Sequence, residues 1–112
     1  MSIASVEVTD HSEEVIAEIK SKMPTILEAL GLAGESNAVM EITSLGAVDT
    51  GNLRNSISHA DDGVYAYIGT NVEYAPYVEL GTSRMEARPF LQNAVLNHLD
   101  EYRQIFEDNL KN

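Results

Sequence analysis

An apolar stripe at helical spacing runs through the first third of the chain and constrains the fold more than any other feature. From Ser12, hydrophobic side chains recur every three or four residues through SEEVIAEIKSKMPTILEALG. Ser12 can cap such a helix, and Glu13 and Glu14 suit its positively polarised start. The stripe consists of Val15, Ile16, Ile19, Met23, Ile26, Leu27 and Leu30. We expect a helical region over residues 12–46, with the stripe facing either the core or another subunit.

Pro24 interrupts this helical region. A proline inside a helix lacks the backbone donor and crowds the preceding turn, so we expect a kink near Met23 or a restart with Pro24 in the first turn. Gly31 and Gly34 weaken the next stretch, but a helical face continues through SNAVMEITSLG to about Leu45. Both a kinked continuous helix and a broken helix satisfy this pattern.

The next segment, residues 47–91, changes character. A β-prone SIS, the turn-forming DDG at residues 61–63 and the alternating VYAYIG predict an antiparallel hairpin. Side chains alternate along a strand. One face therefore carries Tyr65 and Tyr67, and the other, the predicted core face, carries Val64, Ala66 and Ile68.

After Pro89 the helical period returns. Apolar residues recur every three or four positions over residues 89–111, which predicts a C-terminal helix of about five turns. The order of helix, hairpin, irregular segment and helix predicts an α+β fold in which the long C-terminal helix packs on the small sheet. At 112 residues we expect a single domain, with residues 1–11 as a flexible N-terminus.

Composition excludes several classes of function. The chain has no cysteine, which removes disulfides, thiol chemistry and cysteine-ligated zinc. Neither a signal peptide nor a membrane-spanning run is present, so we expect synthesis in a cytoplasm and no membrane partner. A net charge of −11 predicts repulsion from nucleic-acid phosphates, and hence no sequence-specific nucleic-acid binding.

The sequence shows no pattern typical of an enzyme. No HExxH, GxSxG, P-loop or GxGxxG occurs, and His11, His59 and His98 fall in different predicted elements. His59 stands in HADDG, a composition typical of a solvated hairpin turn rather than a metal site. We therefore expect no catalytic residues, no cofactor and no metal.

Tyrosines and arginines gather in the middle of the chain. Four tyrosines lie close together at Tyr65, Tyr67, Tyr74 and Tyr77. Their acidic neighbours favour an interface or the rim of the core over base stacking. Arg54, Arg84 and Arg88 could each pair with a carboxylate of their own subunit or of a neighbour, and the neighbour is favoured if oligomers form.

The segment DTGNLR suggests a turn with a structural role. Asp49 or Thr50 can cap it, Gly51 permits a positive φ angle, and Leu53 anchors the chain after the turn. The segment carries no chemistry of its own.

Several blocks together resemble the small tail-component family of tailed bacteriophages, the neck or tail-completion proteins of long-tailed phages and prophages. The blocks are TGNLRNSI at residues 50–57, IGTN at 68–71, YAPYVELGT at 74–82 and ARPFL at 87–91. The resemblance covers residues 48 to about 95. The chain departs from the family's pattern at Glu86, where a proline is common, and at QNA, where a basic residue and a proline often precede the alanine.

The resemblance implies a non-enzymatic virion protein that assembles, as a ring, where the tail meets the head. Its partners would be other copies of itself and other neck or tail proteins, with DNA passing through the ring. Head-tail joining, tail completion and a minor tail role stay as alternatives within this class. It would be made in the bacterial host cytoplasm and reside in the virion.

Residue roles follow from combining the resemblance with the residue chemistry. The candidates for the subunit interface are Tyr74, Tyr77, Glu79, Arg84 and Arg88, and the structural motif residues are Asp49, Thr50, Gly51, Leu53, Arg54, Pro76, Gly81, Pro89 and Phe90. Residues 74–82 would form a short helix and a turn. A function from another class, an acidic DNA mimic that inhibits a nucleic-acid-binding protein, is motivated by the charge of −11.

Overall fold

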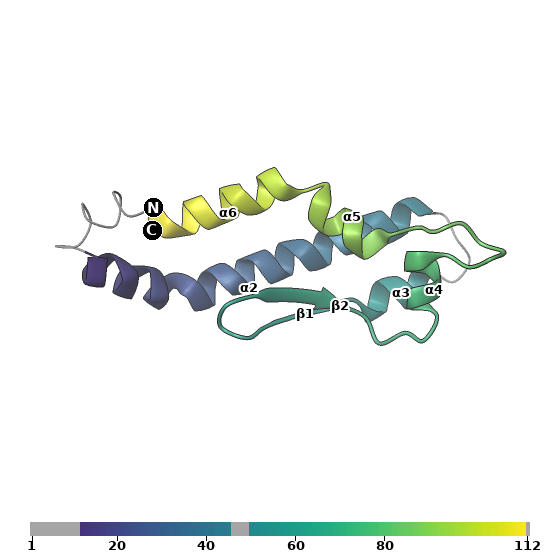
Figure 1. Ribbon diagram of the computed structural model, residues 1–112, viewed down its shortest axis with the longest axis horizontal. Coiled ribbons are helices and arrows are strands. Elements are labelled where there is room, and N and C mark those ends of the chain that lie inside the picture. The colour runs from purple at the N-terminus through teal and green to yellow at the C-terminus, as the bar shows by residue number, and fades with distance from the viewer. Residues whose placement is uncertain (1–11, 46–49, 112) are drawn as a thin grey trace.

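The computed structural model describes residues 12–45 and 50–111, arranged as one long helix with a hairpin and shorter helices along it (Figure 1). The elements are α2 (Ser12–Leu45), α3 (Thr50–Ser56), β1 (Ser58–Asp61), β2 (Ala66–Gly69), α4 (Ala75–Leu80), α5 (Phe90–Leu96) and α6 (Leu99–Lys111). The predicted α+β class is confirmed. The predictions for residues 1–11 and for Asp49 lie outside the described residues.

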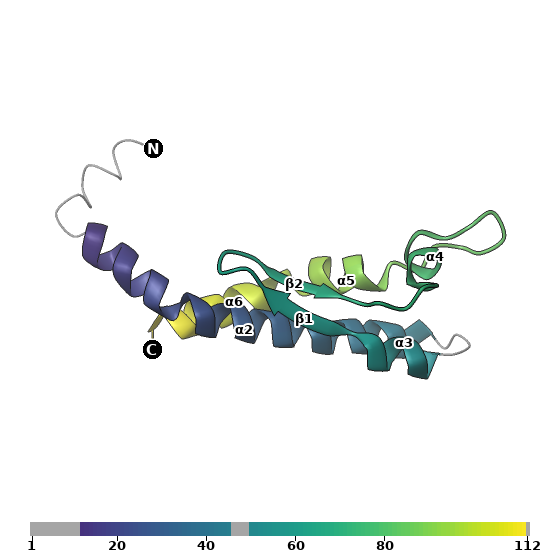
Figure 2. The ribbon, with the colours of Figure 1, turned by 90° about the horizontal axis from the view of Figure 1, so that it is seen from below.

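Helix α2 is continuous over 34 residues and includes Pro24. The described part of α2 reaches Leu45, and the predicted boundary at position 46 lies outside the described residues. Figure 2 shows the first turns of α2 at an angle to the rest of the helix. The kinked continuous helix is therefore correct and the broken helix is wrong, because packing along most of its length outweighs the lost backbone hydrogen bond at the proline.

The hairpin pairs β1 with β2 in the antiparallel sense, with Ser58 opposite Gly69 and Asp61 opposite Ala66. The predicted turn is confirmed. The carboxylate of Asp62 accepts hydrogen bonds from the backbone N–H groups of Val64 and Tyr65, at 2.9 Å and 2.7 Å. Such side-chain acceptors are the reason aspartate favours turns.

The predicted core face of the hairpin is only partly correct. Ile68 packs against the buried cluster, as expected. Val64, however, is 66% exposed, because it lies in the turn before β2 begins rather than in the strand. Tyr65 and Tyr67 are both more than half exposed, and the centroids of their rings lie 6.3 Å apart.

Two glycines of α2 allow the hairpin to lie directly on the helix. A Cβ at Gly31 would stand 2.7 Å from Cδ2 of His59, and a Cβ at Gly34 would stand 2.9 Å from Cγ2 of Ile68. Side chains there would push the hairpin away. The glycines that looked like weak points of the helix are thus the positions where β1 and β2 approach it.

The C-terminal helix differs from the prediction in two respects. It is broken into α5 and α6 by a turn at residues 97–98, and both helices pack mainly on α2 rather than on the sheet. Asn97 ends α5, and asparagine competes poorly for helix interiors. After the turn, buried Asn37 of α2 donates to the side chains of Glu101 and Tyr102. The break lets each helix lie along α2 separately.

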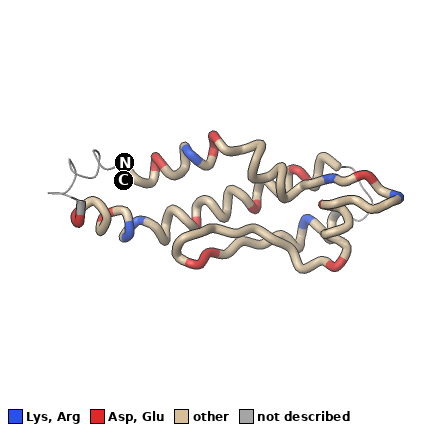
Figure 3. Tube along the Cα trace, in the orientation of Figure 1, with Lys and Arg blue, Asp and Glu red and all other residues tan. Residues whose placement is uncertain are grey.

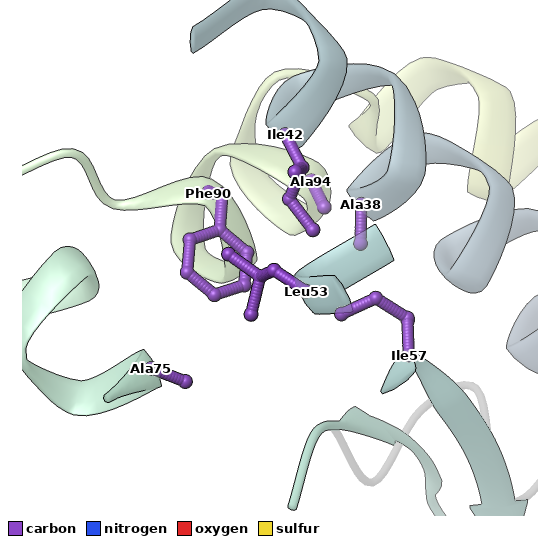
Figure 4. Packing of buried hydrophobic residues seen from close by; sticks show 7 residues of the cluster. All are labelled: Ala38, Ile42, Leu53, Ile57, Ala75, Phe90 and Ala94. Atoms are coloured by element: carbon purple, nitrogen blue, oxygen red, sulfur yellow. The ribbon is translucent and has the colours of Figure 1, made fainter. Parts of the chain in front are cut away.

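The buried cluster lies where the second half of α2 meets α3, α4 and α5 (Figure 4). It consists of Ala38, Ile42, Leu53, Ile57, Ala75, Phe90 and Ala94. The cluster occupies a small part of a long molecule that measures 59 × 25 × 21 Å. Its radius of gyration, 18.0 Å, exceeds the roughly 13 Å of a compact chain of this length.

Candidate subunit-contact surface

Residues 50–54 of the DTGNLR segment form the first turns of α3 rather than an isolated turn. Gly51 lies inside this helix with no positive φ angle, so that prediction is wrong. Leu53 is buried, and so is Ile57 four residues later. This spacing, at which two side chains share one helix face, was the signal for a helix. Arg54 projects outward, with Nη1 3.5 Å from Oγ1 of Thr43.

The YAPYVELGT block forms α4, with Pro76 in the first turn, where its missing N–H is not needed. The short helix predicted for this block is confirmed. Ala75 and the half-buried Tyr74 face the core. Tyr77 and Leu80 face outward, 60% and 77% exposed. Of the two tyrosines proposed for the interface, Tyr77 is therefore the more accessible.

Gly81 ends α4 in a backbone conformation that only glycine adopts easily, with φ 79° and ψ 171°. Its N–H donates to the carbonyl oxygen of Tyr77 at 2.8 Å. The chain then forms a loop over residues 82–89 and returns to α4, where the Arg88 N–H donates to the Val78 carbonyl at 2.7 Å. Figures 1 and 2 show this loop projecting at one end of the molecule.

Glu79 connects α4 to the start of α5 within the subunit. Its carboxylate accepts hydrogen bonds from the backbone N–H groups of Leu91, at 2.9 Å, and Gln92, at 3.1 Å. These amides belong to the first turn of α5, where they have no partner within the helix. Negative charge is also favourable there. This interface candidate thus has a structural function inside its own chain, and Pro89 and Phe90 begin the helix that it caps.

Replacing Glu79 with alanine is expected to lower the free energy of unfolding by about 1–2 kcal/mol, because two amides of α5 lose a charged acceptor. Glu73→Ala is the matched control, since Glu73 is exposed and lies just before α4. Urea denaturation of both variants measures the difference. Equal losses in the two variants would contradict the capping function.

Arg54, Arg84 and Arg88 are exposed, and Figure 3 shows basic positions on α3 and on the loop after α4. Within residues 12–45 and 50–111, no carboxylate lies within ion-pair distance of any of the three. The ion pairs that do form among the described residues involve His59, His98 and Arg103. The structure thus brings Tyr77, Leu80, Arg84 and Arg88 to one end of the molecule, and we call α4 with residues 81–89 the α4 end.

His59 has a different role from the solvated turn residue predicted. It lies on β1 and points to α2, where Nδ1 is 2.7 Å from Oε1 of Glu35 and Nε2 is 2.9 Å from Oε2 of Glu28. Gly31 lies between these glutamates and leaves room for the ring. The sequence signal was a pair of glutamates two helical turns apart with a glycine midway. Among the described residues no group of three or more acidic, histidine or cysteine side chains could hold a metal ion.

The pKa of His59 is raised from its ordinary value of 6.5, chiefly by the hydrogen bond to Glu35 and then by that to Glu28, while burial opposes this. A raised pKa in the folded state means that the stabilisation is complete below the unfolded pKa and is lost as pH rises through the folded pKa. His59→Gln should therefore destabilise the protein more at about pH 6 than at about pH 8.5. Denaturation at both pH values tests this, and a difference independent of pH would contradict it.

The structure is that of an elongated α+β protein that exposes tyrosine, leucine and arginine side chains at one end. A family model described as "Bacteriophage HK97-gp10, putative tail-component" matches residues 3–81. This is well over half of the chain, and the chain belongs to this family of phage tail components. The resemblance is thereby confirmed, although the ARPFL block lies beyond the matched range.

Comparison with curated proteins and with solved structures gave no significant match. In the part of the chain that the structure describes, no helix is both long and apolar enough to cross a membrane.

Proposed function

We propose that the chain is a non-enzymatic structural subunit of a phage or prophage tail that acts at the junction of head and tail, in head-tail joining or tail completion. In this proposal it assembles with copies of itself, as a ring, and contacts other neck or tail proteins. It functions in the virion after synthesis in the bacterial host. Family membership supports the tail component, and the α4 end supports assembly.

The observation that carries the assembly proposal is a set of arginines on α3 and at the α4 end that have no carboxylate partner among residues 12–45 and 50–111. The chain has 18 acidic and 7 basic residues, so each arginine has many possible carboxylate partners. Yet none of Arg54, Arg84 and Arg88 has one within the described residues. Arginine, tyrosine and leucine exposed together are typical of a protein-protein contact, where arginine binds carboxylates in a bidentate manner.

The acidic charge fits an assembly through which DNA passes. A ring with a net charge of −11 per subunit would not retain passing phosphates, which favours free movement of the duplex. A DNA mimic would use the same charge differently, by presenting carboxylates to a basic protein. Exposed arginines beside Tyr77 disfavour that alternative, since they would repel a basic partner.

Replacing Arg84 and Arg88 with alanine should abolish assembly while leaving the fold intact. Both side chains are exposed and unpaired within the described residues, so the free energy of unfolding should change by less than about 0.5 kcal/mol. Arg103→Ala is the matched control, because Arg103 is also exposed but pairs with Asp100 on α6. Light scattering measures assembly, and denaturation followed by circular dichroism measures the free energy of unfolding. A double variant that assembles as the wild type does would contradict the proposal.

A further inference from the structure

The side chain of His59 ties the hairpin to α2 through both of its ring nitrogens. Nδ1 lies 2.7 Å from Oε1 of Glu35, and Nε2 lies 2.9 Å from Oε2 of Glu28. An ionised carboxylate accepts hydrogen bonds and cannot donate them, so each ring nitrogen must be the donor. The two contacts therefore exist together only when the imidazole carries both protons and a positive charge.

The two glutamates are not equivalent. The side chain of Glu28 is 65% exposed, whereas that of Glu35 is 32% exposed. A neutral imidazole has one N–H donor, and its other nitrogen would turn a lone pair toward a carboxylate, which is unfavourable. The contact to Glu28 is the one that breaks, because it is the longer of the two and water can readily solvate the released carboxylate.

The other charged groups near His59 are engaged elsewhere. On β1, Asp61 lies on the same face of the strand, and its carboxylate accepts a hydrogen bond from the N–H of Gly63 at 3.0 Å. On β2 the residue opposite His59 is the uncharged Ile68. The ion pairs of α6 and of the turn before it do not include His59 among the described residues. Protonation of His59 therefore acts on its contacts with the two glutamates of α2.

Apolar packing holds the base of the hairpin but not its tip. Ile57, just before β1, is 7% exposed and belongs to the buried cluster, and Ile68 packs against that cluster. Residues 61–65, which we call the tip, are all exposed. Figure 1 shows the tip pointing along α2, away from α3. Loss of the Glu28 contact therefore releases the tip while the base stays in place.

The tip forms one side of an apolar groove of about 300 Å³. Leu27 of α2, which is 3% exposed, lies in its floor. Val95 of α5 and Tyr102 of α6 form one side, and Val64 and Tyr65 of the tip form the other. A tip that moves away from α2 would widen this groove and uncover its floor.

We propose that His59 is a pH-sensitive latch: with both ring nitrogens protonated the tip lies closed on α2, and loss of one proton releases the tip from Glu28 and opens the groove. The pKa of His59 is raised above its ordinary value of 6.5, first by the hydrogen bond to Glu35 and then by that to Glu28. The closed state is therefore fully favoured at low pH, and this preference is lost as pH rises through the raised pKa. The latch acts within one chain and does not depend on the proposed function.

Distances between two spin labels measure the position of the tip. The chain has no cysteine, so Val64→Cys on the tip and Leu32→Cys on α2, both at exposed positions, accept nitroxide labels in the full chain. Pulsed electron paramagnetic resonance should show one short distance at about pH 6. At about pH 8.5 a longer distance should appear, with an open fraction at least about threefold larger. With Ser58→Cys at the base in place of Val64→Cys, the distance should be the same at both pH values.

Two variants separate the latch from other groups that titrate in this range. Glu28→Gln provides an amide, which can accept from the protonated ring through its oxygen and donate to the neutral ring through its nitrogen. Its tip should therefore stay closed at both pH values. His59→Gln does not titrate, so its open fraction should be the same at both pH values. Circular dichroism verifies that each labelled chain is folded.

His98→Gln is the matched control. His98 also lies near two glutamates, 3.6 Å from Glu41 and 3.5 Å from Glu101, but it belongs to the turn between α5 and α6 and not to the hairpin. This variant should open at the tip as the wild type does. An open fraction that is independent of pH in the wild type, or that still rises with pH in His59→Gln or Glu28→Gln, would overturn the latch. Loss of the opening in His98→Gln would overturn it as well.

Discussion

Replacing Phe90 with alanine is expected to lower the free energy of unfolding by about 3–5 kcal/mol. Phe90 is 1% exposed and is the largest fully buried side chain. Figure 4 shows its ring from α5 beside Leu53 from α3, with Ile42 of α2 close by. Truncation would leave a cavity at the meeting point of these helices. Because small domains have only about 5–15 kcal/mol of stability, the loss is a large fraction of the total.

The matched control is Phe106→Ala. Phe106 lies on α6 and is 36% exposed, so its truncation leaves no closed cavity and should cost about 1 kcal/mol. Guanidinium denaturation of the two variants measures both changes. Similar losses would show that the cluster around Phe90 does not carry the stability of the fold.

Replacing Gly81 with alanine should have the second largest effect, a loss of about 2–5 kcal/mol. The backbone conformation at Gly81, φ 79° and ψ 171°, strains any other residue. In addition, a Cβ would stand 2.7 Å from the backbone nitrogen of Ala87 and 3.0 Å from the carbonyl oxygen of Met85. The loop would have to move, and Arg84 and Arg88 with it. The variant should therefore lose assembly as well as stability.

Substitutions at two other glycines distinguish the cost of backbone strain from the cost of a steric clash. Gly63 has φ 93°, but a Cβ added there would meet no atom within 4 Å, so Gly63→Ala should cost only about 1–2 kcal/mol. Gly69 has neither a positive φ angle nor a close neighbour, so Gly69→Ala should change stability by less than about 1 kcal/mol. Thermal denaturation of the series should rank Gly81 first. A loss at Gly81 no greater than at Gly63 would contradict the collision with the returning loop.

The elements that could be predicted from the sequence are those in which apolar residues recur at a regular spacing or a short turn motif occurs. Residues 12–45 carry a helical period long enough to outweigh Pro24, and DDG between β-prone segments specified the hairpin. The short helix and turn over residues 74–82 were expected from the resemblance together with the residue chemistry, and Pro76 lies in the first turn of α4 and Gly81 at its end. The prediction of a single domain stays a prediction, as do the interface assignments of Tyr74 and Tyr77.

The features that escaped prediction depend on tertiary contacts. The helical spacing of apolar residues could not show that the C-terminal helix breaks at residues 97–98, because the break follows from packing along α2. The capping of α5 by Glu79 joins residues 12 and 13 positions apart. The pairing of His59 with Glu35 joins residues 24 positions apart. Such pairs have no local signature, although Gly31 between two glutamates was a usable hint.

Microscopy of phage particles tests most directly whether the chain is a structural subunit of the tail. Particles purified after lysis of the host that carries the gene can be labelled with antibody to this chain and examined by electron microscopy. We expect label at the end of the tail that meets the head, and separate heads and tails when the gene is deleted. Absence of the protein from purified particles, with normal particles produced without the gene, would contradict a structural role in the tail.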